Sequence, residues 1–170
     1  MQPFTVESIN ETLELFGVSP STVRSAVDAA DTASDAVNLI SEAIAESPGG
    51  AVIELGDTLQ EGLDALVVSC HRCGVGLTSS GNVVEVSRGS DVRTFSEVYR
   101  QSEDSFNPVM HAVEKAVDGH LRIFPLRSTL GADCQTFAVL TKHDWERLLR
   151  TLGAPAFNIL FVGLDGKPIV

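Results

Sequence analysis

The sequence has few of the features that identify a membrane, secreted or disulfide-stabilised protein. In its 170 residues no apolar run is long enough to span a membrane, because glycines and charged residues interrupt each one. The N-terminus, MQPFTVESINE, lacks the basic start and apolar stretch of a signal peptide, so we expect no secretory leader. The three cysteines are an odd number without the spacing of a disulfide framework, which favours a reducing compartment and a cytoplasmic location.

Basic residues are almost missing from the first part of the chain. Residues 1–70 contain twelve acidic residues and one basic residue, Arg24, whereas residues 71–170 contain eleven of each kind. The formal net charge of -11 at pH 7 therefore lies entirely in the N-terminal part. An asymmetric charge of this kind indicates an interaction surface, although acidic helices also keep a protein soluble.

Hydrophobic residues make up 44% of the chain and charged residues 21%, which is typical of a globular protein with an apolar core. Apolar periodicity, together with capping and stop residues, predicts helices at residues 5–16, 20–47, 92–101, 108–117 and 141–152. Short apolar runs between turn residues predict strands at residues 51–55, 67–68, 82–86, 121–126, 137–140 and 157–162. We therefore expect an α+β fold with a mixed β-sheet.

The segment Ser47-Pro48-Gly49-Gly50 is the best candidate for a linker, because proline and two glycines interrupt any regular element. It separates an acidic helical arm, residues 1–48, from an α+β body, residues 49–170, in which helices flank the sheet. A body of this length is within the usual domain range, so we expect it to fold without the arm.

Cys70-His71-Arg72-Cys73-Gly74 has the spacing of a zinc knuckle, in which two thiolates reach one ion and a glycine permits the turn behind them. Cys70 and Cys73 are therefore candidate zinc ligands between two expected strands. A structural zinc site needs four ligands, so Cys134 or the histidines would have to complete it. The alternatives are two buried thiols or a redox pair, in which case the protein needs no cofactor.

Residues 13–27, LELFGVSPSTVRSAV, resemble the helix-turn-helix reader of bacterial repressors through Gly17-Val18-Ser19 at the turn and Thr22-Val23 in the following helix. The resemblance implies that this second helix contacts DNA. Here, however, the helix offers one basic residue, Arg24, and leads into two aspartates. Because DNA binding relies on basic residues that neutralise phosphates, we do not expect the acidic arm to bind nucleic acid.

Residues 83–101 with 121–152 loosely resemble the nuclease fold that carries a PD-(D/E)-x-K site, since helix, three strands, helix and strand follow in a similar order. The resemblance implies that Asp64 and Glu85 are metal ligands. Ser87 stands where that site has the lysine that helps to activate the attacking water. This alternative is therefore a degenerate, nuclease-like domain.

The acidic arm is the main candidate for an interaction surface. Its first expected helix has an apolar face flanked by acidic residues, formed by Val6, Ile9, Leu13, Phe16, Glu7, Glu11 and Glu14. Elsewhere Arg88, Arg93 and Arg100 are candidates to pair with carboxylates, because the planar guanidinium suits interfaces.

These residues predict a non-enzymatic interaction or assembly protein. It would be an oligomeric component of a macromolecular or viral particle, or a small acidic binder or inhibitor of another macromolecule. Its expected partners are another protein or further copies of itself, without a membrane.

Overall fold

The computed structural model describes residues 4–19, 21, 23, 32–96 and 105–170, and its α+β class is the expected one. The helices are α1 (Val6–Leu15), α3 (Ala33–Ala45), α4 (Leu59–Arg72), α5 (Asn107–Ala116) and α6 (Lys142–Leu160). The strands are β1 (Gly50–Glu54), β2 (Gly76–Ser80), β3 (Val83–Arg88), β4 (Asp91–Ser96), β5 (Leu121–Pro125) and β6 (Cys134–Thr141).

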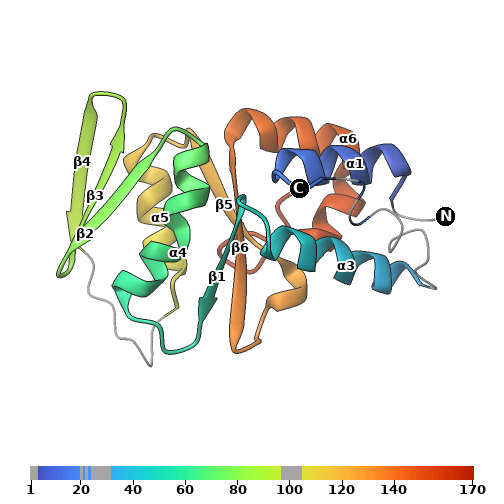
Figure 1. The fold of residues 1–170 in the computed structure, drawn as a ribbon, viewed down its shortest axis with the longest axis horizontal. Coiled ribbons are helices and arrows are strands. Elements are labelled where there is room, and N and C mark those ends of the chain that lie inside the picture. The colour runs from blue at the N-terminus through green and yellow to red at the C-terminus, as the bar shows by residue number, and fades with distance from the viewer. Residues whose placement is uncertain (1–3, 20, 22, 24–31, 97–104) are drawn as a thin grey trace.

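These elements lie in layers (Figure 1). An outer sheet, with strand order β2-β3-β4, faces helices α4 and α5, and these helices separate it from a central sheet with strand order β1-β6-β5. Helices α1, α3 and α6 cover the other face of the central sheet. All described strand pairs are antiparallel, so the expectation of a mixed sheet is wrong.

Threonine caps explain where most of the helices begin. Thr5, Thr32, Thr58 and Thr141 each accept a hydrogen bond from the backbone N–H three residues later. The first helix is confirmed, with Thr5 as its cap and Gly17 (φ 80°) just after its end. The single helix expected at residues 20–47 is wrong, because the extended backbone of Thr32 starts a separate helix there. Residues 20, 22 and 24–31 lie outside the described part of the chain.

The central sheet contains strands that were all expected from the sequence, at β1, β5 and β6. Pro125 ends β5, and β5 is an edge strand, as the missing N–H of proline requires. The middle strand, β6, is buried on both faces from Thr136 to Leu140. At its centre Ala138 lies opposite Gly50 of β1 and Phe124 of β5.

Two expectations for the outer layers are wrong. The strand expected at residues 67–68 lies within α4, which buries Leu59, Leu63, Leu66 and Cys70 at helical spacing. The helix expected at residues 92–101 begins as strand β4, because Gly89 (φ 60°) permits a tight turn that returns the chain along β3. Residues 97–101 are outside the described part.

The C-terminal helix corrects another expectation. As expected, a helical segment starts after Thr141 and is interrupted at Gly153 (φ 74°, ψ 158°), but the chain then continues as a second helical segment to Leu160. The apolar run at residues 157–162 is therefore mostly helix, and only Phe161 makes a β-bridge, to Leu126. Its expected burial is confirmed only in part, because Phe157, Leu160, Phe161 and Val162 are buried but Ile159 is 38% exposed.

Two clusters of buried side chains stabilise the fold, one on each face of the central sheet. The aliphatic core joins the central sheet to α4, α5 and the outer sheet. The aromatic core joins it to α1, α3 and α6, and contains Phe16, Phe124, Trp145, Phe157 and Phe161. The division at residues 48 and 49 stays a prediction, although α1 and α3 share this core with the C-terminal helix. None of the described helices is long and apolar enough to cross a membrane.

Candidate functional site

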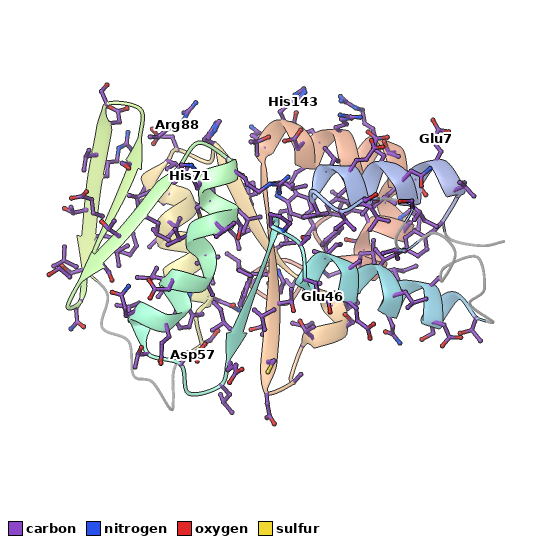
Figure 2. The ribbon with its side chains drawn as sticks, viewed as in Figure 1. Glu7, Glu46, Asp57, His71, Arg88 and His143 are labelled. Carbon is purple, nitrogen blue, oxygen red and sulfur yellow. The ribbon has the colours of Figure 1, made fainter. Side chains whose placement is uncertain are left out.

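The acidic residues nominated on the first helix gather in one shallow groove. Helix α1 buries Ile9, Leu13 and Phe16 in the aromatic core, so its other side faces solvent beside α6. That side forms the acidic groove, with a volume of about 490 Å³, lined by Val6, Glu7, Asn10, Glu11, Glu14 and Arg147. Figure 2 shows Glu7 projecting outward from α1. The expected apolar face is thus corrected, since three of its four residues are internal and only Val6 is exposed.

Glu11 fixes the position of α1 on α6. Its carboxylate accepts hydrogen bonds from the Thr151 hydroxyl at 2.7 Å and from the Arg147 guanidinium. The Thr151 hydrogen bond, followed by the Arg147 contact, lowers the pKa of Glu11 below its ordinary value, against a partial opposing effect of burial. Glu11 is therefore a charged structural contact, and Arg147 is neutralised by it.

Glu7 and Glu14 differ from Glu11, because both are exposed and neither has an ion-pair partner within the described residues. Their spacing along α1 places them on the same side of the helix. Between them the Asn10 side-chain oxygen is enclosed and accepts no hydrogen bond from the described part of the chain. The groove thus offers the exposed methyl groups of Val6 and two carboxylates without an ion-pair partner among the described residues, a set suited to a cationic protein side chain.

A second groove, on the same side of the molecule, contains two basic residues, two histidines and two acidic residues, one of which is paired with Arg93. The basic groove has a volume of about 490 Å³ and is lined by Arg88, Asp118, Gly119, His120, Thr141, Lys142, His143 and Glu146. Figure 2 shows Arg88 and His143 along the upper edge of the view. Arg88 and Lys142 have no ion-pair partner among the described residues.

The predicted arginines are partly brought together here. Arg93 binds Asp118 through both ends of its guanidinium, at 2.8 Å each, and this hydrogen bonding lowers the pKa of Asp118, to which the charge of Arg88 also contributes. Arg93 is therefore already paired, whereas Arg88 is free. Arg100 lies outside the described residues.

The zinc site expected at Cys70 and Cys73 stays a prediction. Both are buried, at the C-terminal end of α4, where desolvation raises the pKa of Cys70 to about 12 and that of Cys73 to about 11. Without a metal ion, both thiols are therefore protonated near neutral pH. Within the described ranges no group of three or more potential ligands is positioned around a common point, and Cys134 is exposed at the start of β6.

The nuclease-like arrangement is also not assembled. A helix, three strands, a helix and a strand do follow one another, as α4, β2, β3, β4, α5 and β5, but these are not the expected elements, since residues 67–68 lie in α4 and residues 92–96 in β4. Asp64, however, is on the exposed side of α4 and accepts a hydrogen bond from Gln60 at 2.6 Å. Glu85 is exposed on the face of the outer sheet that points away from α4, between Thr78 and Thr94. The outer sheet therefore separates the two carboxylates.

Several residues of the two grooves were not expected from the sequence. Arg147 and Thr151, one helical turn apart on α6, contact Glu11 from more than 130 positions away in the chain. Lys142 and His143 belong to the expected helix start; His143 was one of the histidines that could complete a zinc site, and Lys142 had no assigned role. Helical spacing in the sequence indicates that Lys142, His143 and Arg147 are exposed on α6. It does not indicate that α6 packs beside α1.

No family model matches this chain, and neither a curated protein nor a solved structure does. Of the segment that resembles a helix-turn-helix, residues 20, 22 and 24–27 lie outside the described part, whereas Gly17, Val18 and Ser19 lie within it.

Proposed function

We propose that this is a non-enzymatic protein-binding protein, which takes a basic protein surface in the acidic groove of α1. The observation that carries this proposal is the pair of exposed, unpaired carboxylates Glu7 and Glu14 on either side of the fixed Glu11–Arg147 contact. Free carboxylates attract lysine and arginine, and the groove contains one base that is already neutralised.

The acidic groove also contains an apolar side chain beside its carboxylates. Exposed Val6 supplies apolar area beside these carboxylates. Electrostatic complementarity mainly increases the association rate and specificity, while apolar contact contributes affinity. The three free cysteines support a reducing, cytoplasmic setting for this interaction.

The test is binding of a fluorescently labelled arginine-rich peptide, followed by fluorescence anisotropy. We expect saturable binding that Glu7→Gln combined with Glu14→Gln weakens about tenfold, a loss of about 1.4 kcal/mol. The matched control is Glu42→Gln combined with Glu46→Gln, which removes the same charge from exposed positions on α3 and should weaken binding much less.

Two results would contradict the proposal. Absence of saturable binding would show that the groove has no affinity for basic segments. An equal loss of affinity in both double variants would show that the peptide responds to net charge and not to the groove.

A further inference from the structure

We propose that the basic partner is a second copy of this chain, and that two copies pair about a two-fold axis, with each acidic groove facing the basic groove of the other copy. This inference rests on the proposed function and names its partner. It uses the basic groove, which the proposed function leaves unassigned.

The two grooves lie on either side of the first turns of α6. Lys142, His143 and Glu146 line the basic groove, while the next residue, Arg147, lines the acidic groove. Five residues of α-helix span about 7.5 Å, so the two grooves adjoin each other along α6. In Figure 2 the labelled residues Arg88, His143 and Glu7 follow one another along the same upper edge.

The unpaired charges of the acidic groove are negative, whereas those of the basic groove are two positive charges and one negative charge. The acidic groove offers Glu7 and Glu14, and the basic groove offers Arg88 and Lys142, with His143 beside them. The other charges at these grooves are largely internal pairs, Arg147 with Glu11 and Arg93 with Asp118. Glu146 is the remaining exposed acid at the basic groove.

Adjacent patches of opposite charge make the whole surface complementary to itself. A half-turn about an axis through the start of α6 places the acidic patch of one copy on the basic patch of the other, and repeats the same contact in reverse. Each interface then contains both contacts, so its electrostatic gain is doubled. An unrelated basic protein would use only the acidic half and leave Arg88 and Lys142 unpaired, which is why a second copy is the better fit.

Charge reversal tests this arrangement, with molecular mass measured by sedimentation equilibrium in a buffer of about 0.05 M salt. The acid-reversed variant carries Glu7→Lys and Glu14→Lys, and the base-reversed variant carries Arg88→Glu and Lys142→Glu. All four positions are exposed, and an acidic residue at the start of α6 is compatible with the helix dipole.

We expect the unmodified protein to dimerise and each reversed variant to raise the dimer dissociation constant at least about tenfold, through like-charge repulsion. An equimolar mixture of the two variants should form a heterodimer, and a variant with all four changes should dimerise again. The control variant, Glu42→Lys combined with Glu46→Lys on α3, should dimerise like the unmodified protein. Thermal melting of each variant verifies that it is folded.

Some outcomes overturn this inference without touching the proposed function. If the protein is a monomer but binds the arginine-rich peptide through Glu7 and Glu14, the partner is a different basic protein. If it dimerises but neither reversal weakens the dimer, the interface lies elsewhere. If it neither dimerises nor binds the peptide, both proposals fail.

Discussion

The two faces of the central sheet are covered by different parts of the chain. On one face, the aliphatic core draws its other members from one continuous stretch, residues 59–117. On the opposite face, the aromatic core combines helices from both ends of the chain, α1 and α3 with α6. One half of the molecule is therefore built mainly from local sequence, while the other half requires segments more than 100 residues apart.

The rings of the aromatic core are packed in defined mutual orientations. Trp145 is at its centre, with ring centroids 4.7 Å from Phe124, 4.9 Å from Phe161 and 5.9 Å from Phe16, mostly edge-to-face. Its indole N–H donates to the carbonyl of Arg122 at 2.8 Å, so the buried polar atom is satisfied. At the surface the two halves are joined by Arg72, whose guanidinium donates to the carbonyl of Leu15 at 3.2 Å.

Removing residues 1–48 should have the largest effect, because it takes away one side of the aromatic core. We expect residues 49–170 alone to lose cooperative unfolding, contrary to the expectation from the linker-like sequence. Six described, buried apolar side chains would be lost, and at about 1.5–3 kcal/mol each they rival a typical total stability of ~5–15 kcal/mol. A sigmoidal thermal melt of the shortened chain, followed by circular dichroism, would instead support a separate body.

Single substitutions in the two cores test whether the halves unfold together. Phe16→Ala should cost about 3–5 kcal/mol and Leu66→Ala about 2–5 kcal/mol, because both side chains are fully buried. Urea denaturation measures both values. Hydrogen exchange then shows whether Phe16→Ala also lowers the protection of amides in α4. Loss of protection confined to α1, α3 and α6 would mean that the two faces are separate cooperative units.

Gly62→Ala probes the packing of the aliphatic core alone. Alanine normally favours a helix over glycine by about 1 kcal/mol, but here the added Cβ would lie 2.0 Å from the ring of buried Phe106. Overpacking should therefore make the variant less stable, by about 1–3 kcal/mol in urea denaturation. Asp64→Ala, at an exposed position of the same helix, is the control and should change stability by less than about 0.5 kcal/mol. A stabilised Gly62→Ala variant would show that the ring moves aside without cost.

The smallest effect concerns the polar contact between α1 and α6. Thr151→Val removes the hydroxyl that donates to Glu11 and should cost about 0.5–1.5 kcal/mol near neutral pH. Because the folded-state pKa of Glu11 is lowered, this contribution is present above the unfolded pKa of about 4.3 and is lost as pH falls through the folded pKa. The stability difference from the unmodified protein should therefore shrink in acid. Thr94→Val on the exposed sheet face should show no such pH dependence.

The sequence predicted elements best where a local signal coincides with burial. Thr5 and Gly17 mark the limits of α1, and the strands of the central sheet carry their own apolar runs. The prediction failed at Val67 and Val68, which are 37% and 59% exposed on the solvent side of α4 and therefore do not indicate a buried strand. It failed again at residues 157–162, because a short apolar run fits a buried helix as well as a strand.

For the candidate site, the sequence identified the charged residues that line the grooves. It did not predict which of these residues contact one another. Glu7 and Glu14 share a face because of helical spacing alone. The pairing of Glu11 with Arg147 depends on how α6 packs against α1, and nothing local to either helix specifies it. In the same way, Arg88 and Lys142 line one groove because of how the outer sheet and α6 are placed in the fold, which nothing local to either element specifies.

The middle strand of the central sheet, β6, must pair with β1 and β5 in one register. Since β6 is buried on both faces, hydrophobicity alone would tolerate a shift of one residue against its neighbours. Side-chain volume would not tolerate such a shift. Ala138 leaves room for Phe124 and the Trp145 ring, and a shift would place the larger Phe137 or Val139 at the position of Ala138. The small side chain of Ala138 thus favours the correct alignment of both edge strands. The pattern of polar and apolar residues on β6 would not distinguish it from a shifted alignment.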